Sequence, residues 1–183
     1  MTRPGRVVVS AADIARRLPQ MAAEIAALHP DARAEADWAL VLVCVLKGSL
    51  MVTADLARAL AAVGVAAEIE PIAVRSYLSG TQTTGTVELV KDIGIPLRDR
   101  DVLIVEDVVD TGLTTAFVID QLRSHQPRTL RLATLLDKPG RRLSHVPIDV
   151  TGFVIGDDFV VGYGLDAGER WRELPDVHLL EDA

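Results

Sequence analysis

The chain has 183 residues, which is enough for one well-buried domain and short for two. Hydrophobic residues make up 49% and charged residues 25%, and the longest apolar run, 39–46, is too short to cross a membrane. The net charge of −7 argues against a protein that coats nucleic acid, because phosphate contacts need a basic surface. The single cysteine, Cys44, can form no internal disulfide, and no signal-peptide pattern opens the chain, so a cytoplasmic location is expected.

Helical and strand patterns alternate along the chain. Ser10 can cap a first helix that runs to Leu28, and Pro19 should kink that helix or split it in two. The elements expected next are, in chain order, a strand over 39–46, a helix from 50 to about 63, strands over 66–76 and 86–90, a strand ending at 106, a helix over 114–124 and a strand over 130–136.

This alternation predicts an α/β fold with a central parallel sheet and helices on both faces. In such folds ligands bind at the C-terminal ends of the strands. Lys47, Asp110 and Lys138 each follow a predicted strand, so they should converge on one edge of the sheet. The hydroxyl-rich residues 78–85 cannot build a core and are predicted to form a mobile loop at that edge.

The pattern becomes less regular after residue 138. Short strands are expected near 150–155 and 159–162, among several glycines. We expect a single domain in which residues 36–138 form the core. Residues 139–183, with part of 1–35, should form a small flap over the binding edge.

Residues 102–115, VLIVEDVVDTGLTT, form the most informative segment. An apolar strand ends in Glu106 and Asp107, and Asp110 precedes a turn of small and hydroxyl residues that opens a helix. Such acids often only cap the next helix. Three acids, a glycine and three threonines together instead favour a site for a sugar hydroxyl pair with its metal and for a phosphate on backbone N–H groups. The segment resembles the phosphoribosyl-diphosphate-binding motif of purine phosphoribosyltransferases.

Further motifs extend this resemblance to the hypoxanthine-guanine phosphoribosyltransferases. They are VLKGS (45–49), RSY (75–77), VEDVVDTGLTT (105–115), LLDKPGRR (135–142) and DFVVGYGLD (158–166) with Arg172. The resemblance implies a type I phosphoribosyltransferase fold whose flap is called the hood, Mg²⁺ as cofactor, and a homodimer or homotetramer. It also implies a purine salvage enzyme that moves the 5-phosphoribosyl group from its 1-diphosphate to N9 of hypoxanthine or guanine. These are small-molecule substrates, and no nucleic-acid or membrane partner is expected.

The resemblance assigns a role to each residue of the central motif. Glu106 and Asp107 look like the pair that grips the ribose hydroxyls and a metal ion. Asp110 resembles the general base near the purine N7, although it could also simply cap a helix. The 5′-phosphate loop corresponds to Asp110, Thr111, Gly112, Leu113 and Thr114.

Three residues resemble the purine contacts of the family. Lys138 would donate to the 6-oxygen of the base, since an ammonium group has donors and no acceptor. Phe159 would stack on the base, and Val160 would contact it through its backbone. By composition alone, Lys138 would be a solvated lysine and Phe159 a core residue.

The remaining motifs resemble the diphosphate site. Asp166 looks like a ligand of a second Mg²⁺, and Arg172 like a diphosphate contact. Lys47 and Gly48 resemble a loop that binds diphosphate through its N–H groups, and in the family the bond before Lys47 can be cis. Ser76 and Tyr77 would open a loop that closes over the reacting centre.

Two departures and two alternatives accompany the resemblance. Ala167 and Gly168 differ from the usual residues, which leaves the packing beside the second metal and the preference between guanine and hypoxanthine open, and Trp171 is a larger ring than the usual tyrosine or phenylalanine. One alternative is a xanthine- or guanine-preferring relative. The other is a nucleotide-sensing, RNA-binding regulator on the same fold, for which a basic surface stripe would be expected.

Overall fold

The computed structural model describes residues 2–32, 39–79 and 82–182. Its largest feature is a six-stranded sheet in the order β4-β3-β2-β5-β6-β7, in which every neighbouring pair is parallel except β3 and β4. The strands are β2 (Leu40–Leu46), β3 (Ala67–Ser79), β4 (Gln82–Lys91), β5 (Asp101–Val109), β6 (Thr129–Asp137) and β7 (Val150–Val154). This arrangement confirms the predicted α/β class.

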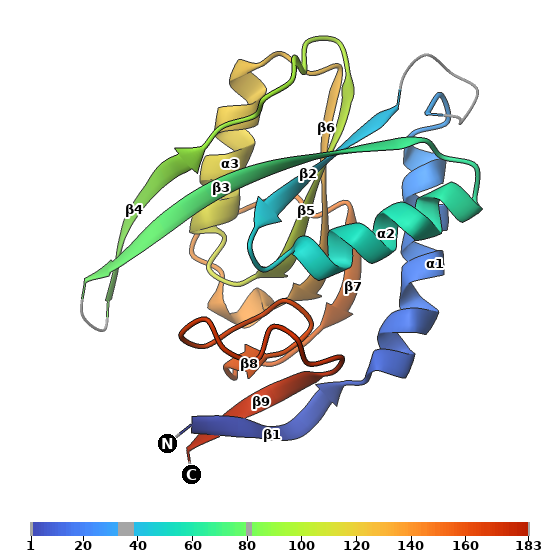
Figure 1. Cartoon of the computed structure of the whole chain (residues 1–183). Helices are drawn as coiled ribbons and strands as arrows, with labels where there is room; N and C mark the ends of the chain where they lie inside the picture. The colour runs from blue at the N-terminus through green and yellow to red at the C-terminus, as the bar shows by residue number, and fades with distance from the viewer. Residues whose placement is uncertain (1, 33–38, 80–81, 183) are drawn as a thin grey trace.

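Helices cover both faces of the large sheet (Figure 1). Helices α1 (Ala11–Leu28) and α2 (Leu50–Ala62) pack on one face, against inward residues such as Leu42 and Leu103. Helix α3 (Leu113–Ser124) packs on the other face, against Val43 and Ile104. Successive strand residues thus enter opposite cores, as the period of a strand requires. A short 3₁₀ helix, η1 (Pro139–Arg141), follows β6.

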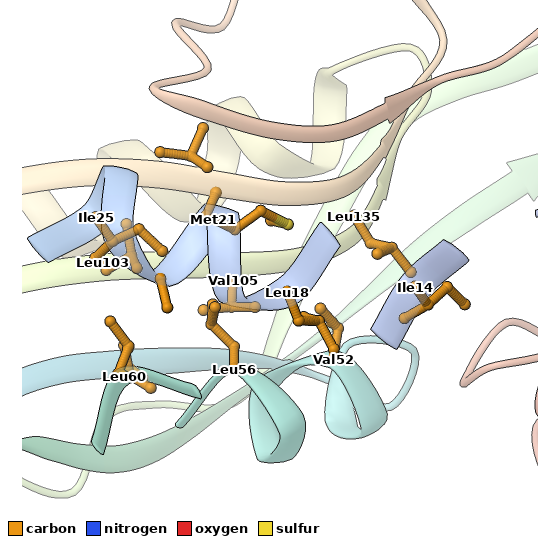
Figure 2. Packing of buried hydrophobic residues seen from close by; sticks show 14 of the residues in the cluster. Ile14, Leu18, Met21, Ile25, Val52, Leu56, Leu60, Leu103, Val105 and Leu135 are labelled. Carbon is orange, nitrogen blue, oxygen red and sulfur yellow. The ribbon is translucent and has the colours of Figure 1, made fainter. Parts of the chain in front are cut away.

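The core under α1 and α2 explains why α1 is continuous. Ser10 caps α1 as predicted, and the helix runs through Pro19 as one element, so it is not split there. Leu18 and Met21 on either side of the proline are buried against α2 and the sheet, as Figure 2 shows. Burial of this apolar face offsets the backbone hydrogen bond that a proline removes.

Strands β3 and β4 extend well beyond their predicted limits. Leu78 pairs with Thr83 and Ser79 with Gln82, so the prediction of a loop over 78–85 is wrong for the residues described there. Residues 80–81 lie outside the described part of the chain. Threonine is a good strand former, and this preference prevails over the polarity of the segment. Strand β5 likewise continues to Val109, which places Glu106 and Asp107 within the strand.

A second, three-stranded sheet lies beyond the C-terminal ends of the parallel strands (Figure 1). It is antiparallel, with the order β1-β9-β8, and consists of β1 (Thr2–Val9), β8 (Val160–Val161) and β9 (Val177–Asp182). Strands from the two ends of the chain therefore pair in the same small sheet. Strand β7, which the sequence placed in the flap, instead pairs with β6 in the large sheet. Within the described ranges, no helix combines the length and apolar character of a membrane span.

Candidate active site

A cavity of about 300 Å³ opens at the C-terminal ends of β2 and β5. Ten of the residues singled out in the sequence line it: Lys47, Gly48, Glu106, Asp107, Asp110, Thr111, Gly112, Thr114, Asp166 and Arg172. They come from the β2–α2 turn, from β5, the following turn and the first residues of α3, and from the segment between β8 and β9. Parallel strands bring their C-terminal ends to a common edge, so residues far apart in the chain meet there.

Close backbone contacts fix the floor of the cavity. A Cβ atom on Gly48 would collide with the Asp107 carboxylate, and one on Gly164 would collide with the Gly48 carbonyl oxygen. Only glycine leaves room for these approaches. The β2–α2 turn, β5 and the segment after β8 are thereby packed directly against one another, and the peptide bond between Leu46 and Lys47 is cis.

Glu106 and Asp107 form a carboxylate pair at the floor of the cavity. Burial, helped by the neighbouring Asp107, raises the pKa of Glu106 well above its usual range, and Thr115 Oγ1 donates to Glu106 Oε1 over 3.3 Å. Burial also raises the pKa of Asp107 to about 6, partly countered by the hydrogen bond from the Val108 N–H. A buried carboxylate next to a half-buried one, neither bonded to a cation, favours the binding of a cation.

The donor set of the cavity fits Mg²⁺, which prefers oxygen ligands and is commonly held by one or two carboxylates together with substrate phosphates. Glu106 and Asp107 are the residues that would hold it beside the sugar, and Asp166 opens onto the same cavity. Within the described residues no cluster of three or more acidic, histidine or cysteine side chains is arranged to hold a metal alone. A substrate would have to supply the remaining ligands.

The turn after β5 has the geometry of an anion site. Gly112 has a positive φ of 82° and precedes the first turn of α3, where backbone N–H groups lack helical partners. The Leu113 N–H is 3.4 Å from Thr111 Oγ1, and Leu113 itself does not line the cavity. A phosphate at this position would accept hydrogen bonds from the N–H groups of the turn.

Asp110 lies at the start of this turn and is held by an arginine. Arg141 Nε in the 3₁₀ helix donates to Asp110 Oδ1 over 2.6 Å. The sequence did not single out Arg141, because an exposed arginine within a motif carries no periodic signal. Its contact with Asp110 becomes visible only in three dimensions.

A chain of charges spans the opposite side of the cavity. Arg172 pairs with Asp166 over 2.7 Å and donates to the Gly164 carbonyl oxygen over 2.7 Å. Glu169 lies 2.9 Å from Lys47 Nζ and 3.4 Å from Arg172 Nη2. Glu169 was also missed by the sequence analysis. The available signal was its position three residues after Asp166, next to Ala167 and Gly168, the two small residues that depart from the family pattern.

The three residues predicted to contact a purine lie beside the cavity and do not line it. Lys138 is buried, its Nζ donates to the Asp158 carbonyl oxygen over 2.8 Å, and burial lowers its pKa. Phe159 is 58% exposed, whereas Val160 is buried in β8. Phe159 is therefore not the core residue, and Lys138 not the solvated lysine, that composition alone predicts.

Ser76 and Tyr77 belong to β3, where Ser76 pairs with Val87 of β4. Their side chains lie outside the part of the chain that the structure describes. Their predicted role at a closing loop therefore stays a prediction.

Comparisons with known proteins agree with this geometry. Residues 12–167 match the model of the phosphoribosyl transferase domain. The chain is 44% identical over 175 residues to a hypoxanthine-guanine phosphoribosyltransferase of Mycobacterium avium, covering 96% of this chain and 85% of that protein. It is 42% identical over 171 residues to a hypoxanthine phosphoribosyltransferase of Salmonella typhimurium, covering 93% and 92%.

A solved structure gives the same result. The hypoxanthine phosphoribosyltransferase of Trypanosoma cruzi in complex with the product IMP superposes with a TM-score of 0.89 at 35% identity, covering 97% of this chain and 95% of that one. Fold, motifs and overall sequence therefore agree over almost the whole length. The chain belongs to the phosphoribosyl transferase family.

Proposed function

We propose that this protein transfers the 5-phosphoribosyl group from 5-phosphoribosyl 1-diphosphate to N9 of hypoxanthine or guanine and releases diphosphate. The observation that carries the proposal is the buried pair Glu106 and Asp107 beside the anion site at the start of α3, within one cavity. The names of the relatives support the same purine salvage reaction. They favour neither a xanthine-preferring enzyme nor an RNA-binding regulator.

The chain holds the sugar phosphate through two groups of residues. Glu106 and Asp107 accept hydrogen bonds from the ribose hydroxyls, and the turn formed by residues 110–114 donates its N–H groups to the 5′-phosphate. Mg²⁺, when bound, neutralises diphosphate charge and makes the diphosphate a better leaving group. Lys47, Gly48 and Arg172 bind the diphosphate from the other side of the cavity, where Asp166 would hold a second ion.

Asp110 acts as the general base. It accepts the proton from N7 of the purine as the bond to N9 forms, a role that requires the carboxylate to lie within hydrogen-bond reach of the base. Arg141, which binds Oδ1 of Asp110, keeps the carboxylate oriented. This assignment is supported by the position of Asp110 between the phosphate turn and Lys138.

The purine binds beside Lys138, Phe159 and Val160. Lys138 can donate to a 6-oxygen and cannot accept from a 6-amino group, so adenine should be a poor substrate. The exposed ring of Phe159 is available to stack on the base, and Val160 offers its backbone. Burial between the ring and the small sheet would exclude water from the reacting centre.

Other features of the enzyme are supported by the resemblance alone. Ser76 and Tyr77 would contribute to closure over the reacting centre, and the small sheet with the segment around residues 155–176 would act as the hood. A homodimer or homotetramer is expected. A reducing cytoplasm suits the single, buried Cys44.

The proposal is tested by supplying the purified protein with 5-phosphoribosyl 1-diphosphate, Mg²⁺ and one purine base at a time. Hypoxanthine and guanine should be converted to IMP and GMP, with adenine converted at least about 100-fold less efficiently. Conversion of xanthine with the highest kcat/KM would favour the xanthine-preferring alternative. No conversion of any base, with tight binding of the nucleotide to the protein, would favour a regulator.

A further inference from the structure

Glu169 lies between the two basic residues that line the diphosphate side of the cavity. Its Oε2 atom is 2.9 Å from Lys47 Nζ and 3.4 Å from Arg172 Nη2. Glu169 itself does not line the cavity, whereas Lys47 and Arg172 do. One carboxylate oxygen thus contacts both of the cations that a diphosphate would bind.

The turn that carries Glu169 is well defined. The Glu169 N–H donates to Asp166 Oδ2 over 2.8 Å, and the residue has a positive φ of 66°. A backbone hydrogen bond from the Ala167 N–H to the Arg170 carbonyl oxygen closes the same turn. The backbone therefore presents the Glu169 side chain to Lys47, which belongs to a different element of the fold.

The two ion pairs of Arg172 differ in how easily they can exchange. The pair with Asp166 is sheltered, because the two side chains are 22% and 27% exposed, and Arg172 is also anchored to the Gly164 carbonyl oxygen. The pair between Glu169 and Lys47 is open to water, with both side chains 64% exposed. Exposed pairs of this kind are weak, so a polyvalent anion can displace the carboxylate.

From these contacts we propose that Glu169 is an exchangeable counter-anion: it occupies Lys47 and Arg172 in the free enzyme, and the diphosphate group of substrate or product displaces it. The inference rests on the proposed function, because it concerns the diphosphate side of that site. Its consequence is that Glu169 lowers the affinity for diphosphate and thereby speeds product release. A carboxylate at this position tunes binding and takes no part in the chemistry.

Glu169→Gln tests the inference directly. The variant keeps the size of the side chain and the backbone contacts but leaves Lys47 and Arg172 without their shared anion. Inorganic diphosphate with Mg²⁺, titrated calorimetrically into the protein at low salt, should bind about twofold to fivefold more tightly than to the wild type. The KM for 5-phosphoribosyl 1-diphosphate should fall by a similar factor, and the gain should shrink at high salt.

Two further variants control for folding and for net charge. Glu169→Gly suits the positive φ and also removes the carboxylate, so it should reproduce the tighter binding. Asp120→Asn removes one negative charge and one exposed ion pair, that with Arg123 on α3, and should leave diphosphate binding unchanged. A gain shared by Asp120→Asn would mean that net charge alone is responsible, and this would overturn the inference.

A Lys47→Gln protein shows whether Glu169 acts through Lys47. If Glu169 acts through Lys47, adding Glu169→Gln to a Lys47→Gln protein should produce a clearly smaller gain than it does in the wild type. Unchanged or weaker diphosphate binding in both Glu169 variants would refute the role of Glu169 while leaving the enzyme active. Failure of the proposed function would look different, because the wild type would then convert no purine base.

Discussion

The acidic residues in and beside the cavity fall into two groups, which differ in whether a basic side chain pairs with them. At the floor, Glu106 is buried and Asp107 is half-buried, and no basic side chain is hydrogen-bonded to either of them in the described structure, although Arg172 lies near enough to lower the pKa of Asp107. At the rim, each of Asp110, Asp166 and Glu169 is paired with an arginine or a lysine. The carboxylates at the floor thus need a bound cation such as a metal ion, whereas those at the rim are already paired with basic side chains of the protein.

This difference separates the two tasks of the site. A carboxylate that lacks an internal partner gains from binding a metal and sugar hydroxyls, since the ligand provides what the fold leaves out. A carboxylate that already has a cationic partner can be displaced from it by another anion, or can be oriented by it. Substitutions at the floor should therefore change ligand binding and stability, and substitutions at the rim should change turnover and exchange.

The largest effect is expected at the rim. Asp110→Asn removes the proposed base but keeps the size of the side chain, so kcat should fall by about 10²–10⁴-fold while the KM for either substrate changes little. Steady-state kinetics with hypoxanthine measure both parameters. Near-normal turnover would refute the role of Asp110 as the base; its side chain caps no helix here, because the N-cap of α3 is Gly112.

Gly48→Ala should disrupt the carboxylate pair at the floor of the cavity. The new methyl group would collide with the Asp107 carboxylate, displace it and reduce kcat/KM by about 100-fold. Gly156→Ala is the matched control, because its nearest neighbour, Asp158 Oδ2, is 3.9 Å from the new Cβ, and the variant should keep its activity. Equal kinetics for the two variants would contradict the close contact at Gly48.

Asp107→Asn should change the pH dependence of the free energy of unfolding. Burial raises the pKa of Asp107 to about 6 in the folded protein, so the folded state binds a proton more readily than the unfolded state. The resulting penalty is absent below the unfolded pKa of about 4 and grows as pH rises through 6. Above pH 6 the asparagine variant should therefore be more stable than the ligand-free wild type by about 1–3 kcal/mol.

Denaturant melts of the ligand-free protein at pH 4 and pH 7.5 measure this difference. The two proteins should converge at the lower pH. The variant should at the same time bind 5-phosphoribosyl 1-diphosphate with Mg²⁺ more weakly. Equal stability at both pH values would show that the Asp107 carboxylate is not under strain in the free protein.

The smallest effect is expected for Thr115→Val, which removes the hydroxyl that donates to Glu106. Hydrogen bonds to ionised groups contribute more than those to neutral groups, so a loss of about 1–2 kcal/mol should grow as rising pH ionises Glu106. Thr134→Val is the matched control, because the Thr134 hydroxyl donates to the neutral Leu136 carbonyl oxygen. Its cost should not depend on pH.

The sequence predicted the large sheet and most of the cavity because both are encoded locally. The valine-rich runs of β2 and β5, and the acids and small residues that follow them, lie within short segments whose patterns are distinctive. The predicted helices also begin at recognisable residues, such as Ser10, which caps α1. Local signals of this kind do not depend on distant parts of the chain.

The missed features depend on distant partners. Strand β1 contains Pro4 and Gly5 and becomes a strand only through its pairing with β9. The contacts of Arg141 and Glu169 are made by exposed side chains, for which sequence periodicity carries no information. The rim of the site was for this reason less predictable than its floor.

The pairing of β1 with β9 also has a consequence for the order of assembly. The Arg6 N–H binds the Glu181 carboxylate, a partner 175 positions away. During synthesis the large sheet has all six of its strands once residue 154 has emerged, whereas β1 must wait without a partner until residues 177–182 follow. Contacts between such distant segments form late, so the sheet that holds the carboxylates can be in place before the small sheet forms.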